Sequence, residues 1–180
     1  MLRRTRTMLV AAAVLAAGIT PVAVTTAAAA PAPYCGITWG STAKSHAPTT
    51  APPLTGIRAG RHDCYDRLVF DVRGTASGYH ASYVSAVTED ASGRPVPLRG
   101  GAKLQLTVTA PANDLAGRPT YRYANRAELV NVTGYRTFRQ VAWAGSFEGT
   151  TTVGLGVRAR LPFRVFTLPG RVVVDVAHAW

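Results

Sequence analysis

The feature that most constrains the fold is a regular alternation of apolar and polar residues along most of the chain after residue 56. Such alternation places successive side chains on opposite faces of a β-strand. Alternating runs lie at 66–72, 78–90, 102–111, 135–147, 150–161 and 163–176, separated by glycine and proline. No stretch keeps helical periodicity for three turns. The sequence therefore predicts an all-β domain at 57–180, an antiparallel β-sandwich or small barrel of about seven strands.

The chain ends in what looks like a second version of its first core strand. The segments "RLVFDV" (67–72) and "RVVVDV" (171–176) share an arginine, an apolar run, an aspartate and a valine. We interpret them as corresponding strands that help to close a sheet; the alternative is that this pattern is simply common in strands. Asp175 should then face away from the core, and Trp180 should cover the end of the sheet. The side chains expected to face the core are Val172, Val174 and Val176.

The first thirty residues predict a secretory signal peptide. Three arginines precede the apolar run "MLVAAAVLAAG", and several A-x-A registers follow, with cleavage expected near Ala28 or Ala30. The alternative is a membrane anchor, but the run is short and alanine-rich compared with the ~20 residues that a spanning helix needs. We therefore predict a secreted, extracellular protein without a stable membrane anchor.

The chain contains two cysteines, Cys35 and Cys64. In an exported protein the expected state is a disulfide, which would stabilise the fold by roughly 3–4 kcal/mol. The alternative, a thiol nucleophile or a metal ligand, has no neighbouring cysteine–histidine spacing to support it. Residues 31–56 are interpreted as an N-terminal segment and a linker rich in proline and threonine, which the disulfide would span.

The charge of the chain favours an anionic partner. It has 20 basic and 9 acidic residues, a net charge of +11, and all basic residues except Lys44 and Lys103 are arginine. Such a charge suits wall polymers, lipid headgroups or nucleic acid. Export argues against nucleic acid, and the sequence contains no recognition-helix pattern or aromatic RNA motif.

Catalytic and metal-binding patterns are weak. "HDCYD" at 62–66 offers a histidine and two carboxylates, but its cysteine is expected to be oxidised. His178 follows Asp175 by three residues, which places the two on opposite faces of a strand. Ser146 lies in a glycine-flanked turn without the G-x-S-x-G frame. The glutamates have no helical histidine partner for zinc. We predict no enzyme activity, no cofactor and no metal site.

Arginine and aromatic residues are interleaved in "GYRTFRQVAW" and "VRARLPFR". On a strand at 150–161, two of these arginines would share one face. An arginine can fork onto a carboxylate while an aromatic ring stacks on a sugar, so the pattern suits an acidic glycan. The alternative is that the aromatic residues belong to the core and the surface arginines have no ligand. The candidate binding residues are Tyr135, Arg136, Arg139, Trp143, Arg158, Arg160 and Arg164.

The closing segment "LPFRVFTLPGRVVVDV" (161–176), with its earlier version "RLVFDV", resembles the AMIN fold family. The resemblance is closer to the AMIN-like domain of small secreted actinobacterial proteins, and "VTGYRTFRQVAWAGSFEGTTTVGLGVRARLPFRVF" is its most specific part. It implies a non-catalytic β-sandwich that localises proteins in the envelope, partly by binding peptidoglycan. The family's aspartate within an apolar strand corresponds to Asp175, and through the repeated segment to Asp71, as structural residues. The chain differs in its cysteine pair, an insertion at 113–131, and the lack of an amidase or secretin domain.

Three functions follow from these observations. The first is a secreted, non-catalytic module of the cell envelope that binds peptidoglycan or another anionic wall polymer. The second is a secreted protein-binding module, such as an inhibitor, that uses the polar segment 113–131. That segment is expected to be a long loop with one helical turn near "NRAEL", and loops of this length are usually functional or disordered. The third is a hydrolase of unknown type.

Overall fold

The part of the chain that the structure, a computed structural model, describes is residues 33–180, and it contains eleven β-strands. A 3₁₀ turn, η1 (Tyr34–Gly36), precedes the strands, which are β1 (Lys44–His46), β2 (Leu54–Arg61), β3 (Tyr65–Val72), β4 (Tyr79–Val84), β5 (Val87–Thr88), β6 (Pro95–Val96), β7 (Ala102–Val108), β8 (Phe138–Phe147), β9 (Thr150–Val157), β10 (Phe163–Leu168) and β11 (Arg171–Ala177). The all-β prediction is confirmed. The predicted count of about seven is too low because β1, β5 and β6 are short and lie among turn-forming residues. The predicted signal peptide at 1–30 lies outside the described residues.

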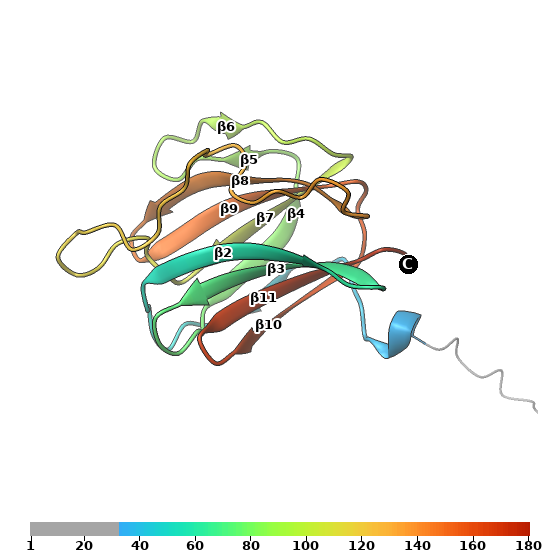
Figure 1. Ribbon diagram of the computed structural model, residues 1–180, viewed down its shortest axis with the longest axis horizontal. Helices are drawn as coiled ribbons and strands as arrows, with labels where there is room; N and C mark the ends of the chain where they lie inside the picture. The colour runs from blue at the N-terminus through green and yellow to red at the C-terminus, as the bar shows by residue number, and fades with distance from the viewer. Residues whose placement is uncertain (1–32) are drawn as a thin grey trace, which may run out of the picture. The chain divides into compact units, whose positions relative to one another are not determined.

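The strands form two antiparallel sheets and a small hairpin (Figure 1). One sheet has four strands in the order β10-β11-β3-β2, and the other has five in the order β1-β4-β7-β9-β8. The β5–β6 hairpin lies on the outer side of the five-stranded sheet, next to β8 and β9 (Figure 1). Of the two predicted architectures, the structure is therefore the sandwich.

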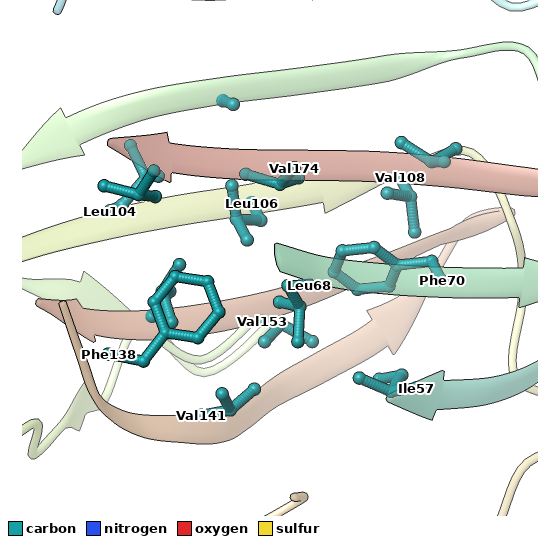
Figure 2. Close-up of a cluster of buried hydrophobic side chains, with 14 of the residues drawn as sticks. Ile57, Leu68, Phe70, Leu104, Leu106, Val108, Phe138, Val141, Val153 and Val174 are labelled. Atoms are coloured by element: carbon teal, nitrogen blue, oxygen red, sulfur yellow. The ribbon is translucent and has the colours of Figure 1, made fainter. Parts of the chain in front are cut away.

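The hydrophobic core lies between the two sheets. Leu68 and Phe70 of β3 belong to one buried cluster with Leu104 and Leu106 of β7 (Figure 2). Burial of each such side chain stabilises the fold by roughly 1.5–3 kcal/mol. The same cluster contains the three valines of β11 that the alternation predicted, each no more than 1% exposed, namely Val172, Val174 and Val176.

Two glycines in β9 allow the chain to cover the outer side of the five-stranded sheet. A Cβ on Gly156 would lie 2.0 Å from the carbonyl oxygen of Arg99, and one on Gly154 would lie 2.7 Å from Leu98. The segment 97–101 therefore packs directly on the backbone of β9. This close approach explains why "VGLGV" has glycine at the positions where an outward side chain would otherwise stand.

The loop at 113–131 closes one side of the sandwich. Its backbone runs along the edge of β8, where Trp143 N donates to Arg126 O at 2.7 Å and Leu129 N donates to Val141 O at 2.8 Å. The Thr120 hydroxyl reaches the other sheet and donates to Leu54 O at 2.7 Å. The long loop is confirmed, but the helical turn expected near "NRAEL" is a simple turn in the structure. The loop therefore protects the sheet edges.

The segment interpreted as a linker is partly built into the sheets, which corrects that prediction. β1 pairs with β4, and β2 already begins at Leu54. Nearby, Gly40 O accepts a hydrogen bond from Phe163 N at 2.9 Å. A composition rich in proline and threonine resembles a linker because it gives no alternating pattern, and only the neighbouring strand reveals the pairing.

The end of the chain differs from the prediction at one residue. β11 is a central strand, as expected, but Trp180 is 72% exposed and does not cover the sheet. His178 N donates to Cys64 O at 2.9 Å, and no later backbone hydrogen bond holds residues 179 and 180 in the described chain. The last residue therefore projects from the sheet into solvent.

Candidate functional site

The two repeated segments lie side by side in the four-stranded sheet. β3 and β11 pair antiparallel, with Arg67 opposite Asp175 and Arg171 opposite Asp71. Each segment has its aspartate four residues after its arginine, so antiparallel pairing places each arginine opposite the aspartate of the other strand. These positions alternate with the core valines, and the four side chains therefore emerge on the outer face of the sheet. The two segments that were predicted to be corresponding strands of a sheet therefore pair directly with each other.

Asp175 is shared by two arginines. Arg67 donates from Nε to Asp175 Oδ1 at 2.7 Å and from Nη2 to Oδ2 at 2.9 Å, and Arg164 of β10 donates from Nε to Oδ2 at 2.8 Å. The carboxylate is 0% exposed, whereas the arginine side chains are 23% and 31% exposed. The hydrogen bond to Asp175 raises the pKa of Arg67 above its ordinary value. Asp175 faces away from the core, as predicted, and leaves one positive charge uncompensated at this surface.

Three aromatic rings surround these guanidinium groups. The Arg164 guanidinium carbon lies 5.5 Å from the ring centre of Trp39, 5.4 Å from that of Tyr65 and 5.0 Å from that of Phe166. Arg67 lies 5.2 Å from Tyr65 and 5.6 Å from Phe166. Cation–π attraction is significant within about 6 Å of a ring centre. All three rings are half-buried, so part of each ring remains available to a ligand.

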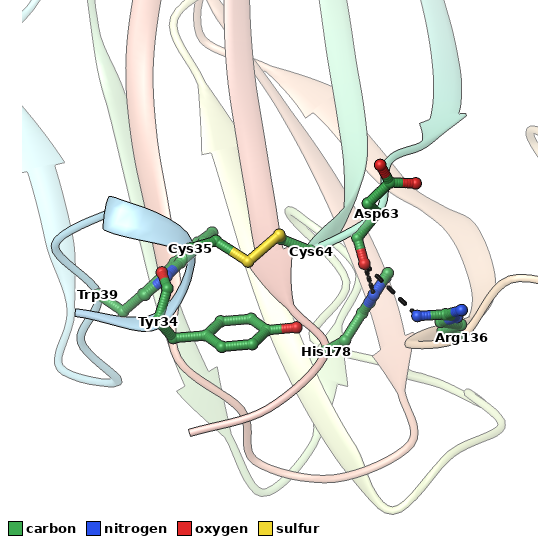
Figure 3. The surroundings of a disulfide bond; sticks show 7 residues. All are labelled: Tyr34, Cys35, Trp39, Asp63, Cys64, Arg136 and His178. Carbon is green, nitrogen blue, oxygen red and sulfur yellow. Dashed lines mark hydrogen bonds between the residues drawn. A yellow bond between two sulfur atoms is a disulfide. The ribbon is translucent and has the colours of Figure 1, made fainter. Parts of the chain in front are cut away.

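The disulfide positions one of these rings. Cys35 and Cys64 are bonded, as predicted, with their Cα atoms 6.3 Å apart (Figure 3). Because Cys64 directly precedes β3, the bond fastens the N-terminal segment beside the four-stranded sheet. Trp39 Nε1 then donates to Tyr34 O at 2.9 Å. The disulfide, this hydrogen bond and the bridge between Gly40 and Phe163 of β10 together hold Trp39 next to Arg164.

A second arginine cluster lies further along the same face. Arg58 of β2 donates from Nε to Asp71 Oδ2 at 2.7 Å and from Nη2 to Oδ1 at 3.1 Å, and Arg171 Nε lies 3.3 Å from Oδ1. This cluster is more open, with arginine side chains 53% and 51% exposed. We call the outer surface that carries both clusters the arginine face; it comprises Trp39, Arg58, Tyr65, Arg67, Asp71, Arg164, Phe166, Arg171 and Asp175.

The structure does not bring the predicted binding residues together. Trp143 lies in the core and is 9% exposed, because β8 has bulges on both sides of it that shift the alternation. Arg158 and Arg160 follow the end of β9 and share no strand face. Their guanidinium groups donate to the carbonyl oxygens of His178 and Ser41. Of the seven predicted residues, Arg164 alone lies on the arginine face.

The other three predicted residues lie around the start of β8. Arg139 donates from Nη1 to the carbonyl oxygens of Tyr135 and Phe138, at 3.0 and 2.9 Å. Arg136 Nη1 donates to Asp63 O at 3.4 Å. Tyr135 and Arg139 also line a cavity of about 410 Å³. Arg139 therefore orders the backbone that leads into β8, whereas Arg136 makes one long hydrogen bond to the turn before β3.

Sequence reasoning missed most of the arginine face. The repeated Arg-to-Asp spacing of four residues was the signal for Arg67 and Arg171, because it places both ends of each segment on one side of a strand. Trp39, Tyr65 and Phe166 give no such signal. Their proximity depends on the disulfide and on the neighbouring strands.

A buried histidine–aspartate pair was also missed. His178 Nε2 lies 3.2 Å from Asp66 Oδ1, and Nδ1 lies 3.1 Å from Asp63 O (Figure 3 shows the latter contact). Asp66 Oδ2 accepts hydrogen bonds from the backbone N–H groups of Thr137 and Phe138, at 2.6 and 3.1 Å. Both ring nitrogens thus have a protein oxygen as partner, and neither is free to act as a general base. The pair joins β3, the entry to β8 and the chain end.

Two further observations concern the part of the chain that the structure describes. Within residues 33–180 no group of three or more histidine, cysteine, aspartate or glutamate side chains is arranged to hold a metal ion. No helix in this part is long and apolar enough to cross a membrane.

Comparison with known proteins gives one match. A family model described as the AMIN-like domain matches residues 52–178. No curated protein and no solved structure matches the chain. The matched region contains the strands β2 to β11, whereas Cys35 and Trp39 precede it.

Proposed function

Because the chain belongs to the AMIN-like domain family, we propose that it is a non-catalytic module of the cell envelope that binds peptidoglycan or another anionic wall polymer. AMIN-type domains generally act as binding modules, and the only buried histidine–aspartate pair among the described residues has no free ring nitrogen. The disulfide is consistent with an extracellular domain. The module would be exported by the predicted signal peptide and require no cofactor.

The arginine face is the observation that carries this proposal. It combines four arginines with two aspartates and three half-buried aromatic rings on the outer side of one sheet. The Nη1 groups of Arg58, Arg67 and Arg164 donate no hydrogen bond to the described protein. Fixed guanidinium donors suit carboxylate or phosphate groups, and aromatic rings suit the faces of sugars.

The experiment is a pull-down of the mature protein with purified peptidoglycan sacculi that retain their acidic polymers. We expect retention at low salt that weakens as salt rises, because exposed charges are screened. Arg164→Gln should reduce retention several-fold. Lys103→Gln, on the outer side of the opposite sheet, is the matched control and should bind like the wild type. Absence of retention at low salt would show that the proposal is wrong.

One observation supports the second function, a protein-binding module. Leu115 is fully exposed at the tip of the 113–131 loop, and Asp114 orders this turn by accepting hydrogen bonds from the backbone of Ala116 and Arg118, both at 2.9 Å. A rigid turn with an exposed apolar tip suits a protein partner. A panel of secreted proteases tests it: inhibition that Leu115→Ser abolishes would favour this function.

A further inference from the structure

We infer that the arginine face recognises a linear polymer with repeated acidic groups, and that its two arginine clusters contact acidic groups on separate units of one polymer chain. This inference rests on the proposed function and specifies its ligand. It predicts a dependence on polymer length that a single anion-binding site would not show.

The strand register sets the distance between the clusters. Arg67 and Asp71 stand four residues apart on β3, and their partners Asp175 and Arg171 stand four apart on β11. Four residues of an antiparallel strand span about 14 Å. The clusters are related by an approximate local twofold axis through the opposed pair Val69 and Val173. The aspartates at the centres of the two clusters are therefore about 14 Å apart along the sheet, and one carboxylate or phosphate group cannot lie beside both.

Each cluster carries a net positive charge and fixed donors. One contains Arg67, Arg164 and Asp175, and the other contains Arg58, Arg171 and Asp71, so each has two positive charges and one negative charge. The aspartate holds the guanidinium groups in place by hydrogen bonds. A guanidinium has five N–H donors, so donors remain for a ligand after the aspartate is satisfied. Fixing them in advance lowers the entropy cost of binding.

The surface between the two aspartates carries one aromatic and one charged side chain. Val69 and Val173 lie beneath it, and because they are only 4% and 1% exposed, the side chains around them cover them. Phe166 stands on one side of this row and Arg58 on the other, as the strand register shows. Trp39 and Tyr65 lie at the more buried cluster only. The two ends therefore differ, and a sugar ring would stack at the cluster that contains Asp175.

The test uses galacturonic acid oligomers of increasing length as probes, with binding to the mature, disulfide-bonded protein measured by calorimetry. Oligomers too short to span about 14 Å can occupy one cluster at a time. Longer oligomers can occupy both, and linked binding commonly raises affinity by about 10²–10⁴-fold. We expect a rise of at least about tenfold at the length that spans both clusters. Polyphosphate chains of matched length form a second arm, and the arm that shows the rise identifies the acidic group.

Substitutions in the open cluster test whether the rise in affinity with oligomer length requires both clusters. Arg58→Gln and Arg171→Gln each change one exposed side chain, and each should bring the ratio of long-oligomer to short-oligomer affinity towards one. Lys103→Gln should keep the wild-type ratio. A thermal melt of each variant confirms that it is folded. An affinity that grows only in proportion to the number of acidic groups, or a ratio that survives both substitutions, would overturn the inference.

The two hypotheses fail in different ways. If the protein is retained by sacculi but shows no rise with oligomer length in either arm, the proposed function stands and the two-cluster inference is wrong. If the rise is present but sacculi are not retained, the polymer recognised is not a wall component. Equal binding of single-stranded DNA of matched charge would assign the face to polyanions in general and contradict recognition of a glycan.

Discussion

At the scale of single residues, the arginine face depends on a buried carboxylate. Asp175 is fully buried because two arginines and their aromatic neighbours cover it, although it stands on the outer side of the sheet. Burying a charge is unfavourable unless it is paired and hydrogen-bonded, and here both oxygens accept hydrogen bonds from guanidinium groups. Asp175 therefore both stabilises the sheet and positions the donors.

Asp175→Asn should lower both stability and polymer binding. The substitution removes the charge between two guanidinium groups that then repel each other, and we expect a loss of about 1–3 kcal/mol in the free energy of unfolding. Urea denaturation measures it. The matched control is Asp71→Asn in the open cluster, where the carboxylate is 28% exposed and the loss should stay below about 1 kcal/mol. Equal losses for both variants would show that burial of Asp175 has no energetic consequence.

His178→Ala should destabilise the protein without affecting polymer binding. Within residues 33–180 it removes the only partner of Asp66 Oδ1. The Asp66 side chain is 1% exposed, and an unpaired buried acceptor costs about 1–3 kcal/mol. His80 is exposed on the outer side of β4, so His80→Ala should change stability by less than about 0.5 kcal/mol. A loss of sacculus binding in His178→Ala with an unchanged melting temperature would contradict a purely structural role.

At the scale of elements, the outer sides of the two sheets are covered differently. The five-stranded sheet is covered near β8 and β9 by the β5–β6 hairpin and the segment after it, which glycine in β9 allows to approach closely. On the four-stranded sheet, the same outward positions hold arginine and aromatic side chains. The glycine-rich and arginine-rich strands thus determine which face is covered and which is available to a ligand.

Gly156→Ala tests the covered side. The new Cβ would lie 2.0 Å from Arg99 O, a backbone atom that can move only with its segment, so we expect a loss of about 1–3 kcal/mol. The control is Gly60→Ala in β2, where the nearest atom to a Cβ is a histidine side-chain nitrogen at 3.8 Å. That variant should be close to neutral in thermal denaturation. A neutral Gly156→Ala would mean that the segment is not packed on β9.

At the scale of the whole molecule, the disulfide links stability to the composition of the binding face. The segment that it fastens lies before the matched family region, yet supplies Trp39 to the arginine face. Further along, the segment is also held by the Gly40 bridge to β10 and by the pairing of β1 with β4.

Replacing both cysteines by serine should therefore have two effects. Opening a loop of about 30 residues should cost roughly 3–4 kcal/mol, and Trp39 should lose its fixed position, so polymer affinity should fall as well. Trp39→Ala with the disulfide intact separates the effects, because it should lower affinity with a much smaller change in melting temperature. Denaturation and calorimetry on both variants measure this. Unchanged polymer affinity in both variants would show that Trp39 does not contribute to binding.

Much of the fold was predictable because it depends on local alternation. The period of two predicted strands at 66–72, 102–111 and 171–176, where β3, β7 and β11 lie, and the side of β11 that enters the core. The prediction weakened where alternation is interrupted. Because β8 has bulges, Trp143 was wrongly predicted to be a surface binding residue. The short strand β1 lies in a proline-rich segment that was predicted to be a linker. The prediction that Trp180 covers the end of the sheet was wrong because the pattern of a strand does not show where its last hydrogen bond lies.

The sequence by itself determined the β class, the core valines and the bonded cysteines, because alternation and a single possible intramolecular pairing require no knowledge of neighbours. It also contained the two Arg-to-Asp segments. Only the tertiary structure decided that these segments are adjacent and antiparallel, so that Arg67 meets Asp175 and Arg171 meets Asp71. The physical reason is that strand order depends on contacts between residues more than a hundred positions apart, which local patterns do not specify.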